Sequence, residues 1–175
     1  MYILVIDLSY QTGTVFILNE SLEVVRQVDA PQSHSLPIRI QELTDNGQIK
    51  LDAVAIPEGP GNFTPLRLAA TIAIALCKSL KIPLIAYSPF LNQVKPTSKE
   101  GEALLDARSS LSYQTFFTQK DSGVEFSPTA LVEKTCDTPY LTCKKNLGFH
   151  IKNLFDSQQF TDIHDLKISY IKQPR

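Results

Sequence analysis

The segment 58–67 has the residue types and spacing of a chemical site. Gly59 and Gly61 form a glycine turn directly ahead of an apolar stretch that predicts a long helix. Such a turn exposes backbone N–H groups and the positive end of the helix dipole, which suits an anion such as phosphate. Neither common phosphate fingerprint fits, because no Lys-Ser/Thr pair completes a Walker loop and Thr64 stands where a dinucleotide loop needs glycine. On spacing alone, a structural turn before a capped helix is favoured over an anion site.

Two aspartates each follow a predicted buried strand and open a polar turn. Asp7 precedes Ser9 in the first turn, and Asp106 precedes Arg108 in the second. In two-lobed nucleotide-binding folds, turns of this kind hold a metal ion and phosphates between the lobes. The commoner role of such an aspartate is to cap its own turn through a side-chain hydrogen bond. We find neither a third acidic residue for such a cleft nor a clear glycine-rich nucleotide loop, so the case for an active phosphotransferase is weak.

The rest of the sequence offers no familiar catalytic pattern. The three histidines and three cysteines lack metal-ligand spacing, and no G-x-S-x-G nucleophile motif is present. Seventeen basic and eighteen acidic residues give a net charge of −1, which disfavours nucleic-acid binding by this chain alone. The N-terminus lacks the basic start of a signal peptide, and no uncharged apolar run reaches about 18 residues. We therefore expect no catalytic residue, no bound metal, no membrane span and a cytoplasmic location.

The elements that would position these residues follow an α/β order. Hydrophobic residues make up 43% and charged residues 20% of the 175, as in an ordinary globular protein. Apolar runs predict an antiparallel meander of three strands, followed by alternating helices and strands. The expected elements are strands at 3–6, 15–18, 22–28, 51–56 and 83–87, and helices at 36–46, from Thr64 with Pro65 in the first helical position, and from Ser88 to about Val94.

A polar stretch at 95–101 is the best boundary signal and divides the chain into lobes of residues 1–97 and 98–175. Beyond it we expect strands at 103–105, 113–119, 140–143 and 167–171, and a helix at 145–154. Both lobes then begin with a strand, a polar turn and a strand. This similarity predicts a duplicated architecture.

The helix after the glycine turn has two apolar-containing faces. Its buried face is expected to comprise Leu68, Ala69, Ile72, Ala73, Leu76 and Leu80. A second stripe contains Arg67, Thr71, Ile74 and Lys78, with the small Ala70 beside it. This stripe is either a surface on which a partner helix packs or a solvated face with one exposed isoleucine. The residue types alone leave both interpretations open.

Several of these motifs resemble one known family in the same order along the chain. Residues 59–67, Gly-Pro-Gly-Asn-Phe-Thr-Pro-Leu-Arg, look like the Gly-Pro-Gly-Ser-Phe-Thr-Gly-Leu-Arg signature of the TsaB family. Further matches are Ile6 to Ser9, His34-Ser35, Tyr87-Ser88 and Asp106 to Arg108. The resemblance extends over residues 1 to about 120. The nine-residue signature is specific, and the order of the other motifs adds weight.

The resemblance implies a duplicated actin-like, ribonuclease H-like fold with a complete first lobe and a shortened second one. It implies a non-catalytic scaffold or activator subunit of the complex that forms threonylcarbamoyladenosine next to the anticodon of tRNA. Such subunits pair through first-lobe helices with the catalytic subunit TsaD and work with the ATPase subunit TsaE. The resemblance further implies no cofactor on this chain alone, ATP use by the complex and indirect contact with tRNA. It leaves two states open for the isolated chain, a homodimer and a monomer.

Particular residues take their expected roles from this resemblance. Interface residues would be His34, Ile38, Phe63, Arg67, Ala70, Thr71, Ile74 and Lys78. Vestigial nucleotide-type loops would contain Asp7, Ser9, Gly59, Gly61, Asp106 and Arg108. The sequence departs from the family pattern at Asn62, Pro65, Ser110 and Leu111. The alternative is an enzyme acting alone, either a degenerate sugar-kinase-like phosphotransferase or a glycoprotease-type peptidase.

Overall fold

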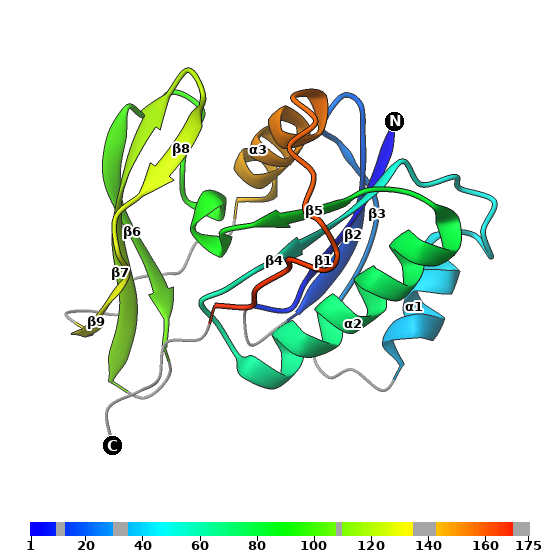
Figure 1. Ribbon diagram of the computed structural model, residues 1–175, viewed down its shortest axis with the longest axis horizontal. Helices are drawn as coiled ribbons and strands as arrows, with labels where there is room; N and C mark the ends of the chain where they lie inside the picture. The colour runs from blue at the N-terminus through cyan, green and yellow to red at the C-terminus, as the bar shows by residue number, and fades with distance from the viewer. Residues whose placement is uncertain (10–12, 30–34, 108–109, 135–142, 170–175) are drawn as a thin grey trace.

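Two β-sheets form the framework of the chain in a computed structural model (Figure 1). The structure describes residues 1–9, 13–29, 35–107, 110–134 and 143–169. One sheet has five strands in the order β3-β2-β1-β4-β5, and the other has the order β6-β7-β8 with β9 also paired to β7. The mixed α/β class predicted from the sequence is confirmed.

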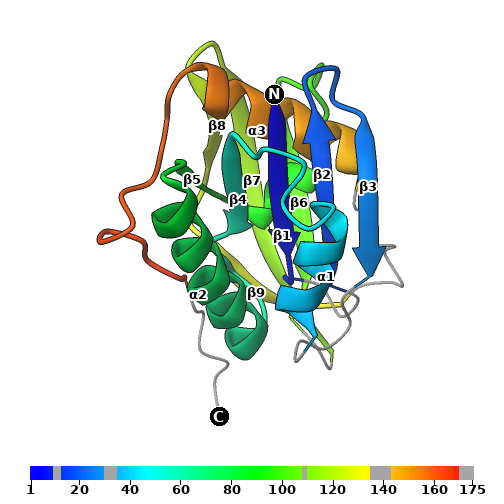
Figure 2. The ribbon, with the colours of Figure 1, turned by 90° about the vertical axis from the view of Figure 1, so that its right-hand side faces the viewer.

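The first sheet begins with the predicted meander. Strands β1 (Tyr2–Asp7), β2 (Thr14–Asn19) and β3 (Val24–Asp29) are antiparallel, whereas β4 (Ala53–Pro57) and β5 (Leu84–Tyr87) run parallel to β1. Helices α1 (Leu36–Leu43) and α2 (Phe63–Leu80) cover one face (Figure 2). Helix α3 (Lys144–Asp156) and the 3-10 helix η1 (Pro89–Asn92) cover the other. Because both faces are covered, β1 is a continuous apolar run.

Helix α2 differs from its prediction in two ways. It begins at Phe63 with Asn62 as the N-cap, so Thr64 is not the cap and Pro65 is the third helical residue. The proline is still tolerated, because the first-turn N–H groups have no partner within the helix. The helix also presents mainly small residues to the sheet: Leu68, Ile72 and Leu76 are only half-buried and Leu80 is exposed. The buried residues are instead Leu66, Ala69, Ala70, Ala73 and Cys77.

By length and composition alone, α2 is long and apolar enough to cross a membrane, the one such helix among the described residues. This is weak evidence, because the core helix of a globular protein passes the same test. Here α2 connects the parallel strands β4 and β5 and packs its small side chains on them. Its composition therefore agrees with a crossover helix that also has an apolar outer surface.

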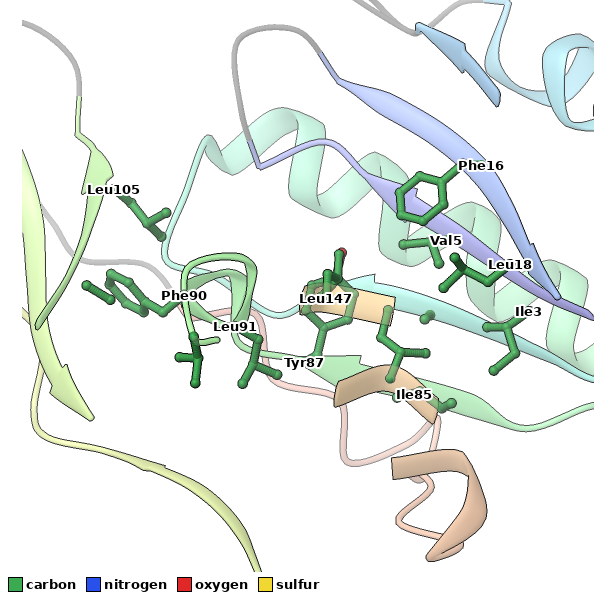
Figure 3. Packing of buried hydrophobic residues seen from close by; sticks show 14 of the residues in the cluster. Ile3, Val5, Phe16, Leu18, Ile85, Tyr87, Phe90, Leu91, Leu105 and Leu147 are labelled. Carbon is green, nitrogen blue, oxygen red and sulfur yellow. The ribbon is translucent and has the colours of Figure 1, made fainter. Parts of the chain in front are cut away.

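The second sheet starts with the predicted hairpin. Strands β6 (Glu100–Asp106) and β7 (Leu111–Lys120) pair along their length, and β8 (Gly123–Phe126) and β9 (Ala130–Glu133), which were not predicted, pair with β7. Inward side chains such as Leu105 join Phe90, Leu91 and Leu147 in one apolar cluster with residues of the first sheet (Figure 3). A continuous core thus connects the two sheets.

The C-terminal part of the chain returns to the first sheet. The predicted helix at 145–154 is confirmed as α3, but residues 167–169 form no strand, and the helix expected to reach Val94 is only the short η1. Residues 140–142 and 170–171 of the other expected strands lie outside the described residues. Because α3 packs against β5 and η1, this C-terminal helix covers the first sheet. The division into lobes at residue 97 stays a prediction.

Candidate functional site

Asp7, in the first polar turn, accepts hydrogen bonds on both of its carboxylate oxygens. Asp7 is only 6% exposed. Its Oδ1 accepts from the Ser9 N–H at 3.1 Å and from the Ser9 hydroxyl at 2.5 Å. Its Oδ2 accepts from Asn92 Nδ2 at 3.3 Å. Asp7 therefore caps its own turn, as the commoner interpretation of the sequence has it, and also connects β1 to η1.

The glycine turn is filled by a distant part of the same chain. Gly59 has φ of 104°, a conformation that residues with side chains rarely adopt. A Cβ placed on it would lie 2.3 Å from the carbonyl oxygen of Ser169. The Ser169 N–H donates to the Glu58 carbonyl at 2.6 Å. A carbonyl oxygen, which repels an anion, therefore lies against this turn.

The remaining turn residues lie around these contacts. A Cβ on Gly61 would lie 3.4 Å from the Ser9 carbonyl oxygen, so the glycine turn and the Asp7 turn pack together. The Glu58 N–H donates to the Tyr87 carbonyl at 2.9 Å, and burial raises the pKa of the Glu58 carboxyl. These contacts tie the ends of β1, β4 and β5 into one junction.

The second aspartate has a cationic partner. Lys134 Nζ lies 2.9 Å from Asp106 Oδ1, and both side chains are partly buried. Arg108, predicted for the same turn, lies outside the described residues. Within the part of the chain that the structure describes, no group of three or more His, Cys, Asp or Glu could hold a metal ion. The absence of catalytic and metal-binding residues stays a prediction.

The stripe predicted on α2 is partly assembled. The Arg67 guanidinium lies 3.8 Å from the centre of the Phe63 ring, and the Thr71 hydroxyl donates to the Arg67 carbonyl at 2.9 Å. Phe63, Arg67, Thr71 and Lys78 are exposed, whereas Ile74 is half-buried. Ala70 is only 7% exposed, because it faces the sheet. Ala70 therefore offers a partner little surface.

Sequence reasoning missed a hollow between α1 and α2. Its volume is about 540 Å³, and its polar rim includes Gln41 and Lys50. The Thr44 hydroxyl, which also borders the hollow, is already used in hydrogen bonds to backbone carbonyls of α1. The sequence does contain a signal for the hollow. Ala69, Ala73 and Cys77 are spaced by four residues and mark the side of the helix that faces the sheet, which leaves the larger Leu76 and Leu80 to line the hollow. The apolar lining consists of Pro37, Ile40, Ile49, Leu51, Leu76 and Leu80.

The predicted interface residues do not all lie on the side of this hollow. Leu76 lines it, and an α-helix turns by about 100° per residue, which places Ile74 about 160° and Arg67 about 180° away around α2. Ile38 of α1 is 58% exposed and follows Pro37, which lines the hollow. The structure thus brings Phe63, Arg67 and Thr71 together on α2 and leaves Ile38 exposed on α1, next in sequence to a residue that lines the hollow. His34 lies outside the described residues.

Comparison with known proteins finds two similarities to proteins of tRNA threonylcarbamoyladenosine formation. The family model of TsaD, tRNA N6-adenosine threonylcarbamoyltransferase, matches residues 30–116. The tRNA threonylcarbamoyladenosine biosynthesis protein TsaB of Buchnera aphidicola subsp. Acyrthosiphon pisum (strain APS) is 27% identical over 153 residues, which are 81% of this chain and 68% of that protein.

Solved structures show the same fold. YeaZ from Pseudomonas aeruginosa superposes with a TM-score of 0.73 at 17% identity, over 97% of this chain and 99% of that one. A protein described as uncharacterized, with similarity to peptidase YEAZ from Pseudomonas aeruginosa, gives a TM-score of 0.71 at 17% identity, over 98% and 99% of the two chains. At this identity the likeness shows the fold alone, which is the expected actin-like one. Together with the glycine-turn signature and the curated relative, this likeness supports a TsaB-family protein.

Proposed function

We propose that this chain serves tRNA threonylcarbamoyladenosine biosynthesis as a non-catalytic scaffold and activator subunit. It binds a TsaD-like catalytic subunit through α1 and α2. The curated relative named for this biosynthesis supports the process. The match of the TsaD family model to residues 30–116, a range that contains both helices, supports a related subunit as the partner.

The apolar outer surface of α1 and α2 is the observation that carries this proposal. Ile38 is 58% and Leu80 49% exposed, and the hollow that Pro37 and Leu80 line is mostly apolar. Exposed apolar surface of this kind, with a polar rim, is typical of a protein–protein contact. The helix-in-groove mode of recognition would place large apolar side chains of the partner in such a hollow.

The other expected features of the complex belong to the same proposal. ATP is used by the complex, with a TsaE-like subunit as its ATPase, and this chain holds no cofactor on its own. The net charge of −1 supports contact with tRNA only through the other subunits. Isolated chains associate as homodimers through the same apolar surface, and the complex works in the cytoplasm.

Binding of the purified chain to the TsaD-like subunit tests the proposal, measured by size exclusion and isothermal titration calorimetry. Two variants are matched: Ile38→Asp on α1 and Phe116→Asp on β7, at residues 58% and 57% exposed. Both side chains point into solvent, so neither change should disturb folding. We expect Ile38→Asp to weaken binding by about tenfold or more, as loss of an interface anchor does, and Phe116→Asp to change it less than about twofold.

Three results would overturn the proposal. The first is failure of the wild-type chain to co-elute with the TsaD-like subunit. The second is an equal loss of affinity in both variants, which would mean that the exposed face of α1 has no special role. The third is ATP hydrolysis or peptide cleavage by the purified chain alone, which would favour the phosphotransferase or peptidase alternative.

A further inference from the structure

The segment 161–169 runs along the outer edge of the first sheet and ends at the glycine turn (Figures 1 and 2). At its start, the Thr161 N–H donates to the Leu84 carbonyl at 2.8 Å, and the Thr161 hydroxyl accepts from the Ala86 N–H at 2.9 Å. At its end, the Ser169 N–H donates to the Glu58 carbonyl. The segment is therefore fixed to β5 at one end and to the residue before Gly59 at the other.

Between these two ends, the apolar side chains of the segment are partly buried and its charged side chains are exposed. Ile163, Leu166 and Ile168 are half-buried against the cluster that includes the sheet-facing side chains of α2. Asp162, Asp165 and Lys167 are exposed. The Asp162 carboxylate accepts from the His164 N–H at 2.8 Å and so shapes the turn between the apolar residues. The apolar side chains of the segment thus extend the hydrophobic cluster between α2 and the first sheet.

Gly59 is fitted to this segment rather than to a phosphate. Its φ of 104° favours glycine, and the Ser169 carbonyl oxygen occupies the place of a Cβ, 2.3 Å away. Any side chain here would push Ser169 away and break its hydrogen bond to Glu58. Because α2 begins at Phe63, only four residues later, a shift of this turn is passed directly to the first turn of the helix.

We propose that residues 161–169 form a clamp that sets the position of the glycine turn and of the first turn of α2. Ser169 and Gly59 are positioning residues of this clamp, and Ile168 is its apolar anchor. With the clamp in place, α2 presents its outer surface in the geometry that the partner binds. This inference rests on the proposed function, because it concerns the helix that the TsaD-like subunit contacts.

The test uses the full chain and two neighbouring substitutions, Ile168→Asp and Lys167→Asp. Both place the same carboxylate in the segment, but only residue 168 is packed against the core. Hydrogen exchange of residues 59–66 is measured on the free chain, and affinity for the TsaD-like subunit by calorimetry. We expect Ile168→Asp to raise exchange at 59–66 by about tenfold or more and to weaken binding about fivefold to tenfold. Lys167→Asp should leave both within about twofold.

A milder variant protects the test against misfolding. Ser169→Pro removes the N–H that bonds Glu58 and introduces no charge, although the ring also fixes φ at this position. It should loosen residues 59–66 and weaken binding in the same direction. Gly101→Ala in β6, where a Cβ would lie 2.8 Å from the Phe117 ring, is the destabilised control. It should lower the melting temperature but leave affinity and exchange at 59–66 unchanged.

The outcomes separate the clamp from the proposed function. If wild type fails to bind the TsaD-like subunit, the proposed function is wrong, but the exchange of residues 59–66 still decides whether the clamp exists. If wild type binds and both Ile168→Asp and Ser169→Pro bind equally well, the clamp does not position α2. If Gly101→Ala weakens binding as much as Ser169→Pro, general stability explains the effect and the clamp is refuted.

Discussion

The hydrogen bond between Asn92 and Asp7 should make a large contribution to stability, and Asn92→Leu tests it. Asn92 is buried in η1, and its Nδ2 donates to Asp7 at 3.3 Å and to the Pro89 carbonyl at 3.3 Å. Leucine has nearly the same shape but donates nothing. The substitution therefore removes one partner of the Asp7 carboxylate while leaving the surrounding packing nearly intact.

The size of the effect follows from the charge and the length of the bond. A hydrogen bond to a charged group contributes about 1.5–3 kcal/mol, and 3.3 Å is longer than the usual N–H···O distance, which favours the lower end. Loss of the weaker bond to Pro89 adds to this, and burial of leucine offsets part of the sum. We expect the free energy of unfolding to fall by about 2 kcal/mol. For a chain of this size, the melting temperature should fall by about 4–8 °C.

Urea unfolding of four proteins measures this contribution: wild type, Asn92→Leu, Asp7→Leu and the double variant. Asp7→Leu also removes the acceptor of Ser9, so its own cost includes more than the pair. The double variant leaves neither Asp7 nor Asn92 buried without its partner, and we expect a coupling energy of about 1.5–2 kcal/mol between the two sites. The same proteins can be melted with and without Mg-ATP to test a nucleotide role of Asp7.

Two results would refute this reasoning. If the two single losses add within about 0.5 kcal/mol, the contact is not a stabilising one in solution. If Mg-ATP raises the melting temperature of wild type but not of Asp7→Leu, the carboxylate serves a nucleotide rather than its own turn, because a ligand that binds only the native state stabilises it.

Three further predictions concern groups with shifted pKa values. Burial raises the pKa of Glu58, so the native state is more stable where Glu58 is protonated, and this stability is lost as pH rises through the native pKa. Glu58→Gln should therefore unfold at a higher urea concentration than wild type at pH 7.5. An equal difference between the two proteins at about pH 4 would contradict this reasoning. Burial lowers the pKa of His150, whose Nε2 lies 3.0 Å from the Val94 carbonyl, so wild type should lose stability as pH falls below about 6.5, in urea unfolding followed from pH 7.5 to 5.5. His150→Gln should flatten this loss, whereas the exposed His164→Gln should keep it. Burial raises the pKa of the Cys77 thiol to about 11, so iodoacetamide at pH 8 should label Cys77 in urea but not in the native chain, and rapid native labelling detected by mass spectrometry would contradict the packing of α2.

The first sheet could be predicted because its strands depend on local sequence. The run Ile3 to Ile6 is apolar on both faces, and the meander and the β4–α2–β5 crossover follow the same pattern. Strands β8 and β9 could not be predicted, since they are short, partly exposed and stabilised by pairing with β7. A strand of four residues is too short for a periodic signal, whether its partner is adjacent in sequence, as for β8, or further away, as for β9.

The orientation of α2 shows why periodicity alone misplaces a functional surface. Leu68, Ile72, Leu76 and Leu80 have helical spacing, and a hydrophobic pattern assigns them to the core. In the structure the buried face of α2 consists mainly of small residues. Leu76 and Leu80 line the hollow beside α1, and Leu68 and Ile72 are half-buried at the edge of the core. Which of two apolar stripes is buried depends on how closely the helix approaches the sheet, and that depends on the small residues. The hollow follows from this choice.

The glycine turn needed the tertiary structure most. The sequence around Gly59 favours a structural turn over an anion loop, but it does not show what lies against the turn. The Ser169 carbonyl oxygen lies where a side chain of residue 59 would be, which supports the structural turn. This contact joins residues 59 and 169, which lie far apart in the chain, so no local pattern predicts it.

The junction between the two sheets favours a binding role over chemistry in a cleft. Phe90 of η1 is fully buried and lies 5.8 Å, centre to centre, from the Phe126 ring of β8. Gln93 adds two hydrogen bonds to Leu104 of β6, one to its carbonyl and one from its N–H at 3.0 Å. Separating the sheets would expose this apolar surface, at a cost of about 1.5–3 kcal/mol for the Phe90 side chain alone. A cleft that opens and closes on a nucleotide would have to overcome that cost in every cycle. Binding through α1 and α2 requires no such movement, because their apolar surface is already exposed.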